Sequence, residues 1–437
     1  MGIAGTAPAF SVAATTATLI AAVGVLSAAS LLYCGLIMFG ITMAFMHLNR
    51  VITNSGASYA WVGQVFHPTL GFLAGWALLV ATAVFMVSGT IPAATATLLL
   101  VAPKYATDPG AVTFVAAGWL MLVSAVIVKG IKPTSYSQVV MTTIEVGVLV
   151  AVIIASLIHY GKHGAHEFSW RWFSLGEFTP TLFATGALTA LFFFWGWDVT
   201  LNLNEETRDS SRAPGLGAVI SMIVAILLFM GFAVAVLLVL SDAEIESSST
   251  NVLFAIAEKL FPHPWSYFAV IAVMLSSIGT LETSILQFTR TMYAKARDGA
   301  LQPRYAILHS SWRTPWVATS VIVGIGLTLL FFSSFFPSIN LIIKDSVNAI
   351  GFQVAFYYGL AGYACAWHFR AEACKNVWSF IMLLAWPAVS ASFLVFIAIY
   401  SIPTFDLITV LIGIGGIAVG VVPMALNRMR RSDVGNL

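Results

Sequence analysis

Charge is scarce in this sequence. Only 9% of its 437 residues are Asp, Glu, Lys or Arg, whereas 59% are hydrophobic. Soluble domains carry about 25% charged residues, so the composition excludes an ordinary soluble protein. The net charge of +2 gives no indication of a nucleic-acid partner. No charged side chain occurs between Met1 and Met46, which is enough sequence for two membrane-spanning helices.

Cysteine pairs and catalytic motifs are missing as well. The three cysteines, Cys34, Cys365 and Cys374, are an odd number and form no CxxC pair, so they predict neither a disulfide framework nor a metal or redox site. The sequence contains no HExxH, no GxSxG and no phosphate loop. We therefore expect no enzyme, no cofactor and no metal.

The chain begins inside hydrophobic sequence. No basic region precedes the first apolar run, so no secretory signal peptide is visible. Only six residues precede Ala7, about 9 Å of helix at 1.5 Å per residue, which is too short to cross half a bilayer. We expect a further N-terminal segment, and leave open whether transport survives without it.

Apolar runs, cut at Gly, Pro and charge clusters, predict an all-α polytopic membrane protein with twelve transmembrane helices. The predicted spans are 1–23, 27–47, 69–99, 111–129, 136–160, 181–204, 214–240, 266–295, 315–335, 341–367, 377–400 and 405–426. With this topology, fifteen of the twenty Lys and Arg residues lie on the side of the termini. Basic residues concentrate in cytoplasmic loops, so we expect a multi-pass cell-membrane protein with both termini in the cytoplasm.

Two of the predicted helices are interrupted. The first contains "GIAGTAPAFS" (2–11) and the sixth contains "FFFWGWDVTLN" (192–202). Pro removes a backbone donor and Gly weakens a helix, and in lipid the freed groups are tolerated only beside protein or a cavity. Interruptions at matching positions of two five-helix halves indicate a transport site at the midplane, although ordinary kinks would leave the same pattern.

Three segments resemble the amino acid–polyamine–organocation superfamily. They are the sixth helix with the following "NEETRDSSRAP" (204–214), "SGASYAWVGQVFHPTLGFLAGW" (55–76), and "RTMYAKARDGALQP" (290–303) followed by "RTP" (313–315). The resemblance covers nearly the whole chain. It implies a leucine-transporter-like fold, with two inverted five-helix repeats at 1–160 and 161–370 and two further helices within 371–437. It also implies secondary transport of amino acids or amines.

The resemblance further implies a substrate site between the two breaks. The carbonyls of Phe192, Phe193 and Trp195 would face a substrate amine beside Gly196, and Trp195 or Trp197 would close over it. The first-helix contribution would come from Gly5, Thr6, Ala7, Pro8 and Phe10. Many members of the superfamily have a second Gly where this chain has Ala7–Pro8, and Pro8 removes one amide donor for a carboxylate.

Carboxylates inside the predicted spans are functional candidates because each is costly in a bilayer. Glu145 and Glu282 are expected to bind a coupling ion or substrate, with a structural role as the alternative. Ser276 and Thr280 share a helix face near Glu282, and the resemblance implies a sodium site there. Asp198 either caps the half-helix that follows Gly196 or contacts the substrate.

Other polar groups have local interpretations. Asp345 follows Lys344, which indicates a local ion pair. Glu205 and Glu206 are either part of a solvated loop or pair with basic residues of 290–297 as an inner gate. Both interpretations remain open at the level of sequence.

The predicted function is therefore secondary active import of an amino acid or related amine. A proton or sodium ion would drive it by alternating access across the lipid bilayer. An exchanger for amino acids or polyamines is the nearest alternative, and a channel or a non-transporting nutrient sensor is a further one. The sequence leaves the substrate and the oligomeric state open.

Overall fold

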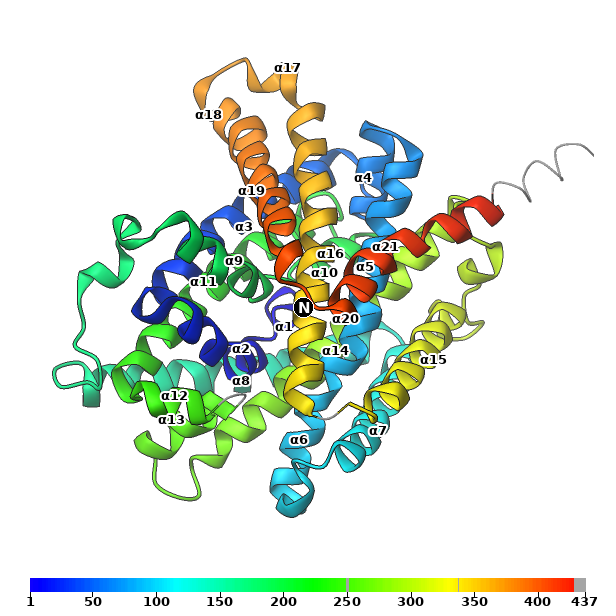
Figure 1. Ribbon diagram of the computed structural model, residues 1–437. Coiled ribbons are helices and arrows are strands. Elements are labelled where there is room, and N and C mark those ends of the chain that lie inside the picture. Colours follow the sequence, from blue (N-terminus) through cyan, green and yellow to red (C-terminus); the bar gives the residue numbers. More distant parts are fainter. Residues whose placement is uncertain (249–250, 337, 428–437) are drawn as a thin grey trace, which may run out of the picture.

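The structure is a computed structural model that describes residues 1–248, 251–336 and 338–427. The described residues form helices and connecting loops, with no strand among them. Part of the predicted third segment, residues 428–437, lies outside the described residues. Figure 1 shows one bundle in which the short helices α1 and α10 lie near the centre, among longer ones.

The first predicted repeat contains eight α-helices, with the 3-10 turns η1 (Gly24–Leu26) and η2 (Pro103–Tyr105) between them. The helices are α1 (Gly2–Gly5), α2 (Pro8–Val23), α3 (Ser27–Val51), α4 (Ser58–Val65), α5 (Pro68–Ser88), α6 (Thr90–Val101), α7 (Pro109–Val128) and α8 (Ile131–Tyr160). The short helix α4, which precedes the third span, was not expected from the sequence.

The second predicted repeat begins with a loop that contains η3 (Trp170–Phe173) and η4 (Leu175–Glu177). Its helices are α9 (Pro180–Phe192), α10 (Val199–Asn202), α11 (Ala213–Val239), α12 (Asp242–Ser248), α13 (Val252–Leu260), α14 (Tyr267–Arg297), α15 (Trp316–Ser333) and α16 (Ile339–His368). The turns η5 (Asn204–Glu206) and η7 (Pro303–Ala306) follow α10 and α14. The two short helices α12 and α13 form the long loop after α11.

The C-terminal part contains two π-helical stretches, η8 (Phe380–Ala385) and η10 (Leu411–Gly415). Around them lie α17 (Arg370–Ala373), α18 (Val377–Ser379), α19 (Trp386–Ser401), η9 (Ile402–Thr404), α20 (Leu407–Val410) and α21 (Gly416–Val419). Tertiary contacts connect α19 with α3 and α16, so these helices belong to the same bundle.

Nine helical segments of the described chain are long and apolar enough to cross a membrane. One of them, Gly2–Val51, is 50 residues long and contains two predicted spans, which meet at η1. The broken helix α9–α10 and the 30-residue α16 occupy two more predicted positions. Each of the twelve predicted spans thus has a helical counterpart within a few residues, and the all-α polytopic fold is confirmed.

Packing brings the centres of the two predicted repeats together. The short helix α1 contacts α10, α11 and α14, and α10 contacts α11 and α14 as well. Short helices leave unpaired backbone groups at their ends. Their position inside the bundle therefore places backbone donors and acceptors where a small polar ligand can use them.

Candidate functional site

Both predicted interruptions are breaks in the helices. In the first, α1 ends at Gly5 and α2 begins at Pro8, with Ala7 left-handed at φ 47°. In the second, α9 ends at Phe192 and α10 begins at Val199, with Gly196 at φ 97°. Pro suits the first turn of a helix, and Gly tolerates a positive φ, so the local sequence explains why each helix breaks where it does.

The two breaks touch through their backbones. A Cβ atom on Gly5 would collide with the carbonyl oxygen of Gly196, and a Cβ atom on Gly196 would collide with the carbonyl oxygen of Gly5. Only glycine at both positions allows this approach. The Gly between the two Trp residues of the sixth span is thus explained by the close contact as well as by its φ angle.

The second break exposes two backbone acceptors. The carbonyl of Phe192 accepts a hydrogen bond from the amide of Trp195 at 3.2 Å. No backbone hydrogen bond within the described part of the chain ends on the carbonyl of Phe193 or Trp195. Of the three carbonyls expected to face an amine, these two remain open to a ligand.

The first break is fixed to α14. The amide of Phe10 donates to Ser276 Oγ at 3.1 Å, and Thr280 Oγ1 donates to the carbonyl of Ala4 at 2.7 Å. Within the break, Thr6 Oγ1 donates to the carbonyl of Ile3 at 2.8 Å. The two hydroxyls predicted to share a face of α14 therefore hold the two sides of the break, one on α2 and one on α1.

The two Trp residues pack against different aromatic rings. Trp195 packs edge-to-face on Phe85 at 5.4 Å between ring centroids, and Phe85 packs on Phe10 at 6.1 Å. Trp197 is fully buried between Phe45 and Tyr358 at 5.2 and 5.3 Å. Trp195 thus lies on the side of Phe10, and Trp197 lies in the packed core.

Asp198 is buried and does not cap α10. It occupies the N-cap position, but its side chain accepts no hydrogen bond from the following amides. Oδ2 instead accepts from the hydroxyl of Tyr357 at 3.1 Å, and that hydroxyl accepts from Trp195 Nε1 at 2.8 Å. Oδ1 has no hydrogen-bond partner in the described chain, although Tyr358 and Gln287 lie close to it. The capping interpretation is wrong, and the carboxyl group belongs to a buried polar cluster with Tyr357, Tyr358 and Gln287.

Two further intramembrane carboxylates lie between α8 and α14, whereas Asp345, on α16, faces Asp406 and forms no ion pair with Lys344 among the described residues. Glu145, on α8, lies beside Ser276 and the backbone amide of Ala9, so it faces the first break. Glu282, on α14, lies away from the break, where Gln138 Nε2 donates to it at 2.9 Å and Ser137 Oγ at 3.1 Å. The four predicted ion-coupling residues therefore divide into a group at the break (Glu145, Ser276 and Thr280) and one carboxylate farther along α14.

A cavity of about 330 Å³ opens toward α12 and α13, on the predicted extracellular side. Its lining includes Phe10, Ala14, Thr95, Asn251, Phe254 and Val273. Phe10 also packs on Phe85, which in turn packs on Trp195. This outer cavity thus leads from the outer loops to the first break.

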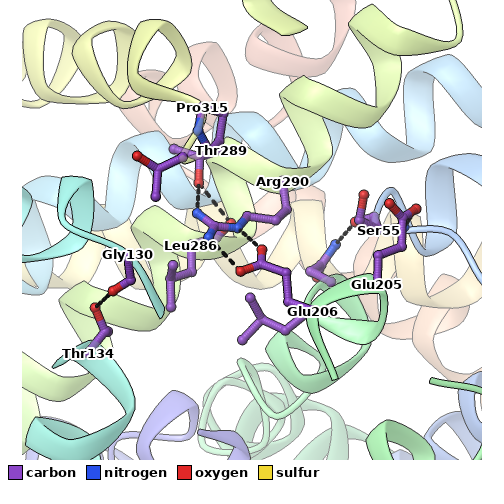
Figure 2. Close-up of polar contacts among 12 residues, drawn as sticks. Ser55, Gly130, Thr134, Glu205, Glu206, Leu286, Thr289, Arg290 and Pro315 are labelled. Atoms are coloured by element: carbon purple, nitrogen blue, oxygen red, sulfur yellow. Dashed lines mark hydrogen bonds and ion pairs between the residues drawn. The ribbon is translucent and has the colours of Figure 1, made fainter. Parts of the chain in front are cut away.

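Ion pairs lie on the opposite side, and Figure 2 shows the one between Arg290 and Glu206. Arg290 forms two hydrogen bonds with Glu206 at 2.7 and 3.1 Å, and Arg297 forms two with Glu205 at 2.7 and 3.1 Å. The amide of Ser55 also donates to Glu205 at 2.9 Å. Burial alone would raise the pKa of Glu205, but the hydrogen bonds from Arg297 and Ser55 hold that pKa below its usual value. We call Ser55, Glu205, Glu206, Arg290 and Arg297 the inner latch.

Buried amides extend the inner latch toward the break. Asn202 Nδ2, at the end of α10, donates to the carbonyl of Ser55 at 2.9 Å and to Thr291 Oγ1 at 3.1 Å. Asn204 Nδ2 donates to Asn49 Oδ1 at 2.7 Å. These bonds join the second break to α3, to the loop before α4 and to α14.

Comparison with known protein families gives a match that covers nearly all of the described residues. A family model described as amino acid permease matches residues 1–422. The chain belongs to the amino acid permease family. This membership makes it a multi-pass membrane transporter with a small-molecule substrate, as the resemblance implied.

Curated relatives of this permease are similar over most of their length. The serine/threonine exchanger SteT of Bacillus subtilis is 23% identical over 389 residues, 87% of this chain and 84% of that protein. The low-affinity putrescine importer PlaP of Escherichia coli K12 is 24% identical over 324 residues, 72% and 68% of the two chains. The b(0,+)-type amino acid transporter 1 of mouse is 22% identical over 345 residues, 75% and 65%.

Some residues of the site were missed by sequence reasoning. Tyr357 donates a hydrogen bond to Asp198, and Gln138 donates one to Glu282. Asn202 donates hydrogen bonds to Ser55 and Thr291. All three are polar residues inside apolar spans or at their ends, which is a signal that the sequence does contain. Their partners lie 144 or more residues away for Tyr357, Gln138 and the Ser55 contact of Asn202, so the pattern of apolar runs could not pair them.

Proposed function

We propose that this permease is a secondary active importer of an amino acid or a related amine, driven by a proton or a sodium ion. The observation that supports this most is the contact of two helix breaks, the second of which leaves the carbonyls of Phe193 and Trp195 without a backbone hydrogen bond. Backbone carbonyls suit an ammonium group, and the start of a helix suits a carboxylate. A zwitterion matches both.

Each part of the site takes one role in this proposal. The carbonyls of Phe193 and Trp195 accept hydrogen bonds from the substrate amine. The positive end of α2 attracts the substrate carboxylate, which takes over the amide of Phe10 from Ser276 when it binds. Trp195 closes over the substrate on the side of the outer cavity. Asp198, with one oxygen free, contacts a second amine when the substrate has one.

The coupling ion belongs at Glu145 in this proposal. Glu145 lies beside the first break, and Ser276 and Thr280 bind the two sides of that break. A carboxylate there neutralises either a proton or a sodium ion, and its change of charge acts on the amides that bind substrate. The bias of basic residues supports cytoplasmic termini, so the inner latch would face the cytoplasm.

Alternating access then consists of opening the inner latch and closing the outer cavity. In the described conformation the ion pairs of the inner latch are formed, and the outer cavity lies on the opposite side. A second cavity, of about 390 Å³, lies on the latch side beside Tyr59 and Asp298. The resemblance implies that the first, second, sixth and seventh spans rock against the third, fourth, eighth and ninth. The inner latch joins the ends of these two groups, because Glu205 and Glu206 follow the sixth span and Arg290 and Arg297 end the eighth.

The proposal is tested by substrate binding and by uptake. A thermal-shift screen of amino acids and polyamines on the purified protein should find a ligand that raises the apparent melting temperature. Uptake of that ligand into proteoliposomes should exceed equilibrium when a proton or sodium gradient is applied. No stabilising ligand and no accumulation under either gradient would overturn the proposal.

A variant of Gly196 tests the site itself. Gly196→Leu should abolish uptake while the protein still inserts, because any Cβ there meets the carbonyl of Gly5 and strains a backbone at φ 97°. Gly118→Leu is the matched control, since Gly118 lies in α7 with no atom within 4 Å of its added Cβ. Wild-type uptake by correctly inserted Gly196→Leu would refute the assignment.

Exchange is the second candidate function, and the similarity to an exchanger favours it. An exchanger should take up labelled substrate only into liposomes preloaded with substrate. It should show no accumulation from an ion gradient alone. The same proteoliposomes therefore distinguish the two functions.

A further inference from the structure

One face of α8 carries a row of polar side chains. Gln138, Thr142 and Glu145 are four and three residues apart, a spacing that places them on the same side of a helix. This face packs on α14, which contributes Ser276, Gly279 and Glu282. Seven residues of α8 separate Gln138 from Glu145, about 10 Å at 1.5 Å per residue.

One end of the row is a carboxylate at the break, and the other is a carboxylate near the inner side. Glu145 is 1% exposed and Glu282 is 2% exposed. Gln138 Nε2 connects the second carboxylate to α14, with bonds of 2.9 Å to Glu282 Oε2 and 2.6 Å to the carbonyl of Gly279. Ser137 Oγ, which is partly exposed, donates to both oxygens of Glu282 at 3.1 and 3.3 Å.

Three buried polar atoms between these carboxylates have no hydrogen-bond partner in the described chain. They are Glu145 Oε2, Thr142 Oγ1 and Gln138 Oε1, and the Thr142 hydroxyl lies against the carboxyl group of Glu145. Buried polar groups are normally satisfied by protein or by ordered water, and water requires room and two to four polar partners. Gly279 keeps the space beside this row free of a side chain, and an added Cβ there would be in ordinary contact with Ala4, Met141 and Gln138 at 3.8, 3.8 and 3.9 Å.

From this arrangement we propose that the α8–α14 interface is a proton pathway between Glu145 and the inner side of the membrane. Water molecules held by Thr142 and Gln138 bridge the two carboxyl groups. A proton leaves the carboxyl group of Glu145, which becomes a carboxylate, and passes along the hydrogen-bonded water to the carboxylate of Glu282. Glu282 then releases it past Ser137, six residues from the start of α8 at Ile131.

Thr142 and Gln138 are positioning residues in this pathway, since neither exchanges its own charge. The proposal rests on the proposed function, because it requires Glu145 to bind the coupling ion. It specifies that this ion is a proton and that it leaves by a route separate from the two helix breaks. Neither Gln138 nor Thr142 was among the candidate residues from the sequence.

Few charged groups act on the two carboxylates. The α-amino group of Met1 faces Glu145, and Glu282 is surrounded by the neutral Gln138 and Ser137. Helices α2, α7 and α11, which also pack on α8, contain no charged residue, and neither does α1. Helix α13 carries Glu258 and Lys259, and Lys259 pairs with Glu244 in the outer loop at 2.6 Å.

The experiment compares two modes of transport in proteoliposomes. A pH gradient of one unit can support about tenfold accumulation of a substrate carried with one proton, because tenfold corresponds to 1.4 kcal/mol. Counterflow of labelled substrate against unlabelled substrate, at equal pH, needs no net proton movement. Gln138→Met and Glu282→Gln should lose the pH-driven accumulation, whereas counterflow should stay within about twofold of the wild type.

Two further variants separate a pathway from a folding effect. Gly279→Ala adds one methyl group beside Gln138 in ordinary contact with its neighbours, so it should exclude the proposed bridging water and abolish pH-driven accumulation without unfolding the protein. Gln353→Met is the matched control. Gln353 is equally buried, donates to the carbonyl of Ile412 at 2.9 Å and has an unpaired Oε1, but it lies on α16, away from the pathway.

The outcomes are distinct for the two proposals. Loss of accumulation in Gln138→Met, Glu282→Gln and Gly279→Ala, with counterflow kept, supports the pathway. Accumulation unchanged in these variants but lost in Glu145→Gln overturns the pathway and leaves the proposed function standing. Accumulation of the wild type under a sodium gradient, with no response to pH, also overturns the pathway. Absence of wild-type binding and counterflow refutes the proposed function itself.

Discussion

Replacing Arg290 with Ala should open the inner latch. The side chain of Arg290 is only 5% exposed, and its guanidinium forms two hydrogen bonds with Glu206, which is 35% exposed. Opening this side separates the two partners and hydrates both. The pair therefore stabilises the closed conformation relative to the open one, and its removal shifts the population toward the open one.

The size of the shift follows from burial. Removing one partner of a fully buried pair costs about 3–5 kcal/mol, and an exposed pair contributes about 0–1 kcal/mol. The pair of Arg290 and Glu206 lies between these limits, so we expect about 2 kcal/mol, or a roughly 30-fold larger open-to-closed ratio. Glu206→Ala should act in the same direction, and the double variant should add less than the two single effects together.

Labelling of a cysteine at Ser55 measures the opening. Ser55 is 4% exposed, and its amide and carbonyl form the bonds to Glu205 and Asn202, so Ser55→Cys retains these backbone bonds. With Cys374→Ser removing the exposed native cysteine, a membrane-impermeant maleimide should react with Cys introduced at position 55 about 30-fold faster in Arg290→Ala. Lys259→Ala, which breaks the pair with Glu244 on the opposite side, should leave the rate unchanged. Equal rates in Arg290→Ala, Glu206→Ala and the parent would refute the latch.

Three other outcomes are expected from the same structure. Trp195→Ala should weaken substrate binding by about tenfold in a thermal-shift titration, whereas Trp197→Ala should mainly lower the melting temperature, because Trp197 is a core residue. Asp198→Asn should remove any preference for substrates with a second amine, and an unchanged preference in competition uptake would exclude this contact. Since the pKa of Glu205 is held below its usual value of 4.5, its contribution to the latch is complete above that pH. This contribution should be lost as the pH falls through the lowered pKa. The labelling rate at position 55, divided by that of an exposed reference cysteine at the same pH to correct for thiolate formation, should therefore be constant down to pH 4.5 and increase only below it.

The spans of this permease were predictable because they depend on single stretches of sequence. Runs of apolar residues long enough for a bilayer, ended by charge, match the observed helices within a few residues. The positions of the breaks were predictable for the same reason, since Pro8 and Gly196 act on their own backbone. The predicted division into repeats at 160 and 370 stays a prediction.

Partners across helices were not predictable, because a membrane helix that is apolar all round gives no signal for its rotation. Asp198 illustrates this limit: its position at the start of α10 favoured a cap, yet its side chain turns to Tyr357, 159 residues away in the sequence. Glu282 is a second case, since its pairing with Gln138 depends on how α8 and α14 face each other. The short helices α4, α12 and α13 were missed because the search was for spans.

The contacts of α14 connect substrate binding with both kinds of movement. Ser276 accepts from the amide of Phe10 on α2, while Thr280, one turn farther along, donates to the carbonyl of Ala4 on α1. Any rocking of the first span against α14 must break one of these bonds. Glu145 lies beside Ser276, so a change in its charge acts on the same group that holds α2. We therefore expect protonation of Glu145 to alter the bond between Ser276 and Phe10 before the latch at Arg290 responds, since Ser276 lies beside Glu145 and Arg290 lies about four helical turns away along α14.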